Sequence, residues 1–225
     1  MATTQYEFPS GLVFNSKIFR PRHFQQNNPI GQGFNQTLDR TIPQWYAEYT
    51  TPPLADTRYD QAIAFLASLK GMTNTFLGWD PRRPMPRAYQ TLSTAADPWT
   101  QTGYSSPAVG TIDNANSFIT LNQMQNGAVV TSGDYFSFQL NSIWWLFRVI
   151  GFSGSSAQSV AASGNSITVK VDPVPVVSTP GSLTPVRYRK ACCEMKMIGD
   201  YNETDQVDSK PILSFKATQF INRGI

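Results

Sequence analysis

The clearest helical pattern in the chain is found in residues 57–71, TRYDQAIAFLASLKG. Asp56 or Thr57 is placed to cap the start of a helix, and Gly71 stands where a C-terminal cap belongs. Together these features predict one amphipathic helix from Thr57 to Leu69. The apolar side chains that recur at helical spacing are Tyr59, Ala62, Ile63, Leu66 and Leu69.

The segment after this helix, residues 72–87, reads MTNTFLGWDPRRPMPR. Its three closely spaced prolines exclude a helix or a central strand beyond Asp80, so a short strand is predicted to run into a stiff extended loop. One interpretation has the arginines of this loop contacting carboxylates or carbonyls of a neighbouring subunit. The other has Trp79 in the core and the arginines solvated. The candidate interface residues are Trp79, Asp80, Arg82, Arg83 and Arg87.

Much of the remaining sequence alternates apolar and polar residues with a period of two, which predicts many short strands. The two strongest runs, Asp134–Leu140 and Trp144–Ile150, flank the polar pair Asn141-Ser142 and predict a β-hairpin. Further strand candidates are Trp45–Tyr49, Ser117–Leu121, Ala128–Thr131, Ile167–Val171, Val186–Ile198 and Ile212–Ile221.

Three stretches are predicted to lack regular structure: the small-residue loop Gly151–Ser166, the proline-rich linker Asp172–Pro185 and the hydrophilic loop Asp200–Asp208.

The organisation that follows is a discontinuous domain, residues 1–90 and 186–225, with an inserted module, residues 91–185. The expected fold class is mainly β: a discontinuous β-sandwich or split barrel with one α-helix, plus an inserted small β-barrel or β-sandwich. Sheet edges in both parts need closing or covering, and assembly with further copies of the chain is one way to do this.

The composition is poor in charge. Lys, Arg, Asp and Glu make up 15% of the 225 residues and leave a net charge of +3, whereas an ordinary soluble domain carries about 25% charged residues. The basic residues are too dilute to follow a nucleic-acid backbone. The longest apolar run, Ile143–Phe147, is too short to cross a membrane. Residues 1–7 show no secretory signal, so we expect a chain that is made and kept in the cytoplasm.

No set of residues in the sequence predicts catalysis, a cofactor or a metal ion. His23 is the one histidine, and no Gly-x-Ser-x-Gly motif accompanies it. Cys192 and Cys193 are adjacent, so in a strand they point to opposite faces, and with His23 they supply too few ligands for zinc. Gly31-Gln32-Gly33 lacks the third glycine of a dinucleotide motif and is interpreted as a turn. We therefore expect a protein that is not an enzyme.

Two other interpretations concern acidic and aromatic residues. Two carboxylates at a suitable separation would fit a glycosidase, but a hydrophilic loop between two strands is the better interpretation of this acidic cluster. A sugar-binding platform of exposed aromatic side chains stays open. The acidic residues are Glu194, Asp200, Glu203, Asp205 and Asp208, and the aromatic ones are Trp99, Tyr104, Trp144 and Trp145.

The helix and the loop after it resemble a segment of the distal tail proteins of long-tailed bacteriophages and related gene-transfer particles. In that segment a helix ends in Leu-x-Gly and is followed by an apolar strand, Trp-Asp-Pro and arginines, as Ala64–Arg87 does here. Trp45–Leu54, which ends in Thr-x-Pro-Pro-Leu, and the strand Leu213–Phe220 fit the same order.

The resemblance implies a structural virion protein of the tail tip, assembled in the host cytoplasm. Such proteins form a ring, usually a homohexamer, between the tail tube and the tip or baseplate. The implied partners are further copies of the chain, the tail tube protein and the tip or hub proteins, and DNA passes through the lumen without sequence-specific contact. Another tail or head-to-tail joining subunit, or a carbohydrate-binding host-attachment module, is the alternative.

Overall fold

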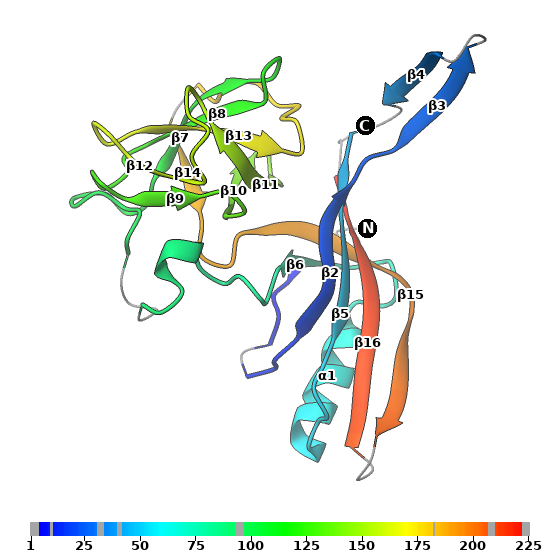
Figure 1. Cartoon of the computed structure of the whole chain (residues 1–225). Helices are drawn as coiled ribbons and strands as arrows, with labels where there is room; N and C mark the ends of the chain where they lie inside the picture. Colours follow the sequence, from blue (N-terminus) through cyan, green and yellow to red (C-terminus); the bar gives the residue numbers. More distant parts are fainter. Residues whose placement is uncertain are drawn as a thin grey trace.

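The computed structural model describes residues 5–9, 11–30, 34–39, 42–92, 97–181, 183–206 and 210–221. Strands make up 49% and helices 8%, so the chain is mainly β, as predicted. The described residues form one α-helix, a six-stranded sheet, a closed six-stranded barrel and two separate pairs of strands. In Figure 1 the barrel lies above the sheet, and a β-hairpin projects away from both.

The six-stranded sheet is built from segments on both sides of the barrel sequence. Its first two strands are parallel, and all its other neighbours are antiparallel. One face is apolar because side chains alternate along each strand, and β5 buries Trp45, Ala47 and Tyr49 there, as its pattern predicted. The strand order is β1 (Gln5–Tyr6), β6 (Thr75–Trp79), β15 (Cys192–Gln206), β16 (Lys210–Gln219), β5 (Gln44–Thr50) and β2 (Asn15–Arg22).

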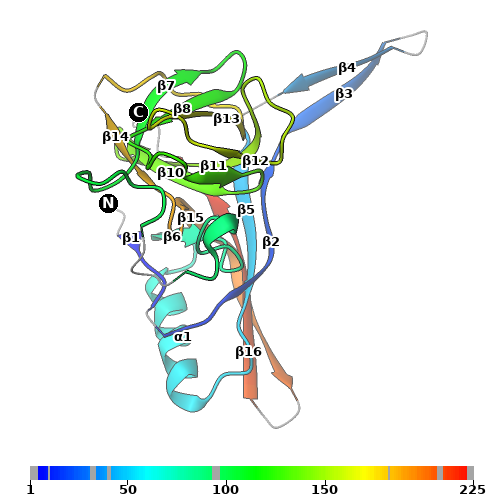
Figure 2. The ribbon, with the colours of Figure 1, turned by 60° about the vertical axis from the view of Figure 1, so that its left-hand side comes forward.

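Helix α1 (Asp56–Ser68) covers the apolar face of this sheet (Figure 2). The predicted helix is confirmed to within one residue at each end, and its buried face includes Ala62, Phe65 and Leu66. The predicted side-chain cap is wrong: Ala55 is the N-cap and offers no side-chain acceptor. After the helix, Lys70 and Gly71 adopt φ values of 47° and 63°, the left-handed conformation that reverses the chain into β6.

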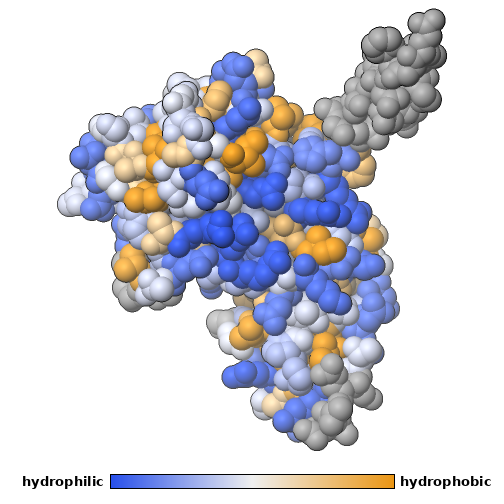
Figure 3. Space-filling model, viewed as in Figure 1, coloured by the Kyte–Doolittle hydropathy of each residue, from blue (hydrophilic) through white to orange (hydrophobic). Residues whose placement is uncertain are grey.

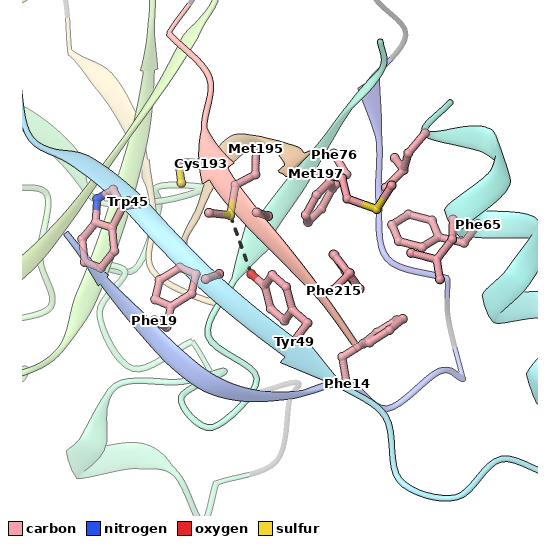
Figure 4. Close-up of a cluster of buried hydrophobic side chains, with 14 of the residues drawn as sticks. Phe14, Phe19, Trp45, Tyr49, Phe65, Phe76, Cys193, Met195, Met197 and Phe215 are labelled. Carbon is pink, nitrogen blue, oxygen red and sulfur yellow. Dashed lines mark hydrogen bonds between the residues drawn. The ribbon is translucent and has the colours of Figure 1, made fainter. Parts of the chain in front are cut away.

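The core between α1 and the sheet is rich in aromatic rings (Figure 4). Phe215 lies with its ring centroid 5.2 Å from that of Tyr49 and 5.9 Å from that of Phe76. Phe76 in turn makes an edge contact with Phe65 of the helix at 5.9 Å. The hydroxyl of Tyr49 reaches the sulfur of Met195 at 3.8 Å, so the polar tip of this tyrosine is also enclosed.

The barrel is closed, so its strands have no free edge. Its interior is filled by buried side chains such as Ile119, Leu121, Phe136, Phe147 and Val149. Its strands, in order around the barrel, are β10 (Tyr135–Leu140), β11 (Ile143–Phe152), β13 (Ile167–Asp172), β8 (Phe118–Asn122), β7 (Ala108–Asp113) and β14 (Thr184–Arg187). The inserted part therefore contains a small barrel, one of the two predicted forms.

The predicted hairpin in this barrel is confirmed. β10 and β11 pair from Leu140↔Ile143 to Tyr135↔Arg148, and Asn141 and Ser142 form the two-residue turn with φ values of 52° and 62°.

Two predicted loops contain strands instead. Within Gly151–Ser166, the first two residues end β11, and β12 (Ser159–Ala161) pairs with β9 (Val129–Thr131). Within Asp200–Asp208, β15 continues to Gln206, because its polar residues pair with β16 up to Gln206↔Lys210. In both cases main-chain pairing outweighs a composition typical of loops.

The projecting hairpin consists of β3 (Gln25–Ile30) and β4 (Phe34–Asp39). It continues from β2 and leads back into β5, and it stands clear of the sheet and the barrel in both Figure 1 and Figure 2. The sequence predicted no strand before Trp45. The predicted turn Gly31-Gln32-Gly33 lies outside the described residues.

The barrel strands lie between Ala108 and Arg187, and the strands of the six-stranded sheet lie before and after them. β14 pairs with β10 at Val186 and Arg187, so barrel pairing extends two residues past Pro185. The division at residues 91–185 stays a prediction.

Candidate interface at the junction of sheet and barrel

The sheet and the barrel meet through an apolar contact reinforced by hydrogen bonds. Trp45 of β5 packs its ring against that of Tyr135 of β10, with centroids 5.7 Å apart. Its indole Nε1 donates to the carbonyl of Leu146 at 2.8 Å. The backbone amide of Cys192 donates to Ser137 Oγ at 3.1 Å. These contacts join β5 and β15 of the sheet to β10 and β11 of the barrel.

The loop from Trp79 to Arg87 crosses this junction, and Asp80 is its most buried polar residue, with 1% of its surface exposed. The Asp80 carboxylate accepts hydrogen bonds from Ser16 Oγ of β2 and from the backbone amide of Arg82. Arg82 also donates to it from Nε at 3.1 Å and from Nη2 at 3.2 Å. This hydrogen bonding raises the pKa of Arg82 above its ordinary value. Asp80 thus ties the loop to the edge strand of the sheet.

The next two arginines connect the loop to the barrel. Arg83 Nη1 donates to the carbonyl of Gly133 at 3.0 Å, and its guanidinium lies 5.6 Å from the ring centroid of Tyr135. The backbone amide of Arg87 donates to Asp134 Oδ1 at 2.7 Å, while the Arg87 side chain is exposed. Burial raises the pKa of the Asp134 carboxyl. Arg82 and Arg83 therefore have partners within their own chain, and their contact with a neighbouring subunit stays a prediction.

Trp79 is half-buried at the other end of this loop and lines a cleft of about 380 Å³. The ammonium group of Lys190 lies 5.1 Å from its ring centroid, and Phe8 makes an edge contact with it at 6.3 Å. The Trp79 indole is therefore neither fully buried in the core nor fully exposed: one side of the ring faces the cleft.

The face of the sheet opposite α1 carries cations. The strand register sets Arg20, Tyr46, Thr218 and Lys196 in one row across β2, β5, β16 and β15. In the next row Glu48 lies beside Lys216 of β16. Figure 3 shows hydrophilic residues gathered on the visible surface where the barrel meets the sheet.

Two of the acidic residues near the carboxyl end, Glu194 and Glu203, have hydrogen-bond partners within the chain. Asp208 and the side chain of Asp205 lie outside the described part of the chain. Glu194 accepts from Thr75 Oγ1 at 2.6 Å, and Glu203 accepts from the Tyr59 hydroxyl at 2.9 Å. Among the residues that the structure describes, no three His, Cys, Asp or Glu side chains come together to hold a metal ion. His23 Nε2 lies 3.2 Å from Asp172, which also accepts from Arg148 at 2.7 Å.

Of the four aromatic side chains considered for a sugar-binding platform, one is fully buried, two are half-buried and one is exposed. Trp99 is fully buried and stacks on Tyr188 with centroids 4.9 Å apart, so its assignment to such a platform is wrong. Trp144 and Trp145 are both half-buried, and Trp145 packs against the barrel core as expected of one of the pair. Tyr104 is exposed.

No family model and no curated protein matches this chain. Within the described ranges, no helix is long and apolar enough to span a membrane.

Proposed function

We propose that this chain is a structural virion protein, the ring subunit at the distal end of the tail of a tailed bacteriophage. In this role copies of the chain, most simply six, close into a ring that joins the tail tube to the tip or baseplate. The ring assembles in the host cytoplasm, leaves a lumen for DNA and carries out no catalysis. The resemblance of Ala64–Arg87 to distal tail proteins and the mainly β fold support this assignment.

The observation that carries the proposal is the projecting hairpin of β3 and β4. Its twelve paired residues bond to each other from Gln25↔Asp39 to Ile30↔Phe34, and neither strand belongs to the sheet or the barrel. An isolated two-stranded hairpin is marginally stable in water. A hairpin of this length is therefore expected to gain its stability from another chain.

The two edges of the six-stranded sheet support the same conclusion. β2 ends the sheet on one side, and on the other side β1 covers only two residues of β6. On the sheet face opposite α1, the side chains of Arg20 and Lys216 are exposed to solvent. Contacts between unlike surfaces of identical subunits generate rings when the rotation closes, and this subunit offers such unlike surfaces at its hairpin, its edges and its cationic face.

The test is to replace residues 25–39 with a short Gly-Ser linker and to follow incorporation into tail particles by cryo-electron microscopy. The altered chain should keep the melting temperature of the parent, because neither hairpin strand pairs with the sheet or the barrel, but it should be absent from particles. A matched control replaces the exposed residues 102–105, Thr-Gly-Tyr-Ser, with Gly and Ser and should be incorporated normally. The proposal is wrong if the parent chain is found in particles as a single copy or repeated along the tail.

A further inference from the structure

The cleft beside Trp79, here called the Trp79 cleft, opens beside the junction and is lined by Leu77 and Trp79 of the sheet and Arg187 of the barrel. Its volume of about 380 Å³ falls within the range of small binding sites, roughly 300–1,000 Å³. It lies between the end of β6 and the turn that follows β1, and its lining mixes apolar and charged side chains. The residues that line it are Glu7, Phe8, Pro9, Gly11, Leu12, Val13, Phe14, Asn15, Leu77, Trp79, Pro81, Arg187 and Lys190.

One wall of this cleft is an open strand edge. β1 pairs with β6 only at Gln5↔Thr75 and Tyr6↔Phe76. Leu77–Trp79 pair with β15 on one side, and on the other side no described strand pairs with them. The carbonyl of Trp79 accepts a hydrogen bond from the Tyr49 hydroxyl at 3.0 Å, and Leu77 is 7% exposed, so the edge is reached through the cleft. Leu77 and Trp79 both line the cleft. An open edge of this kind pairs with an extended peptide through main-chain hydrogen bonds, while side-chain pockets supply specificity.

The charge of the cleft is positive. Arg187 and Lys190 line it, against one acid, Glu7, among the described lining residues. Glu7 lies 3.8 Å from Arg187, but its side chain is 72% exposed, and a pair so open to water contributes little. The Lys190 side chain is exposed above the Trp79 ring. Lys190 and Arg187 are therefore able to bind a carboxylate of another chain, as hydrogen-bond donors and positive charges.

The backbone at Lys190 holds this arrangement in place. Lys190 has a φ of 45°, in the left-handed region that non-glycine residues rarely adopt. Its amide donates to the carbonyl of Pro84 at 2.8 Å, which fixes the turn that leads into β15. This turn places the Lys190 ammonium 5.1 Å from the centroid of the Trp79 ring, at the rim of the cleft.

We propose that the Trp79 cleft binds an extended acidic peptide segment of a partner protein. The segment adds as a strand to the open edge at Leu77–Trp79. Its acidic side chain lies between Lys190 and Arg187, and a neighbouring apolar side chain packs against Phe8 or Trp79. The site involves no residue of the projecting hairpin, but it uses the β6 edge that the proposed ring also offers for contacts. Peptide binding by the purified chain tests the site without ring assembly.

The probe is a fluorescein-labelled peptide, Val-Thr-Val-Glu-Val-Thr, whose binding is followed by fluorescence polarisation. The matched peptide with lysine in place of glutamate should bind at least tenfold more weakly, because it meets the same cations with the wrong charge. A glutamate peptide N-methylated at alternate residues should also bind at least tenfold more weakly, because it cannot complete a strand ladder. Equal binding of the lysine peptide overturns the charge argument, and equal binding of the N-methylated peptide overturns strand addition.

The matched variants are Lys190→Asn and Lys170→Asn. Asparagine tolerates the left-handed conformation, so Lys190→Asn removes the charge and should leave the melting temperature unchanged. It should weaken binding of the glutamate peptide at least tenfold. Lys170 is exposed on β13 and does not line the cleft, so Lys170→Asn should bind as the parent does. Undiminished binding by Lys190→Asn, or no binding by the parent, refutes the site.

Discussion

Replacing Asp80 with alanine should destabilise the fold by about 3 kcal/mol. The carboxylate is buried at the point where β2, the Trp79–Arg87 loop and the barrel approach one another. Its removal leaves the hydroxyl of Ser16 and the guanidinium of Arg82 without their acceptor. Breaking a buried ion pair by removing one partner costs about 3–5 kcal/mol. The lower end applies here because the Arg82 side chain is 51% exposed and returns to water.

Asp80→Asn should destabilise the fold less than Asp80→Ala, because most of the hydrogen bonds to Asp80 go to one carboxylate oxygen. Ser16 Oγ and the Arg82 backbone amide and Nε all donate to Oδ1, and only Arg82 Nη2 donates to Oδ2. The amide oxygen of asparagine keeps the first three bonds and loses the charge and the fourth. Hydrogen bonds to charged groups contribute about 1.5–3 kcal/mol, so a loss of about 1.5 kcal/mol is expected.

Thermal unfolding followed by circular dichroism distinguishes the two variants. For a chain of this size 1 kcal/mol shifts the melting temperature by about 2–4 °C, so alanine should lower it by about 6–12 °C and asparagine by about 3–6 °C. Asp60→Ala, an exposed position on α1, is the control and should change stability by less than about 0.5 kcal/mol. If Asp80→Ala has the melting temperature of the parent, the Asp80 carboxylate is not a buried acceptor for Ser16 and Arg82.

Two further outcomes concern the cores. Leu66→Ala removes a fully buried side chain between α1 and the sheet, so it should cost about 2–5 kcal/mol and reduce soluble yield; a melting temperature equal to the parent's would contradict this packing. Burial raises the pKa of Cys192 to about 11 and that of Cys193 well above its ordinary value, so at pH 8 neither thiol should react with iodoacetamide before unfolding. Because unfolded thiols ionise near pH 8.5 while the folded ones stay protonated, the free energy of unfolding should fall as the pH rises from about 9 towards 11. Rapid labelling at pH 8, or stability that rises over that pH range, would contradict the burial.

Local patterns predicted the elements whose cause is local. α1 follows from apolar residues at helical spacing, and the β10–β11 hairpin follows from alternation around Asn141-Ser142, whose positive φ values suit a two-residue turn. β6 ends at Trp79, as the prolines after it require. These signals lie within a few residues of the structure they specify.

Elements that depend on distant partners were missed. The end of β15, Asp200–Gln206, is rich in polar residues in the sequence, and pairing with β16 makes it a strand. β2 was missed as well: it pairs with β5, and its Pro21 is tolerated because β2 lies at an edge of the sheet. Whether a strand lies at the edge of a sheet depends on the whole sheet, so the neighbouring sequence does not predict it.

The sequence proposed candidate interface residues, but it did not predict their partners within the chain. Asp80 was predicted beside arginines, and one of these does bind it, whereas Ser16 lies 64 positions earlier in the chain. Gly133, which accepts from Arg83, lies 50 positions later. Lys190 and Arg187 reach the Trp79 cleft from a segment more than 100 residues beyond Trp79. The periodicity of a short stretch of sequence does not predict contacts between residues that lie 50 or more positions apart.

The central place of β16 in the sheet determines the order in which a nascent chain folds. β16 lies between β15 and β5, yet it is translated after every strand of the barrel. The barrel strands are contiguous in sequence and are able to close while translation continues. Meanwhile α1 and β5 have left the ribosome without the strands that complete their core, so Phe65 and Tyr49 remain exposed to solvent until β15 and β16 emerge. During that interval these exposed apolar side chains would be available to a chaperone.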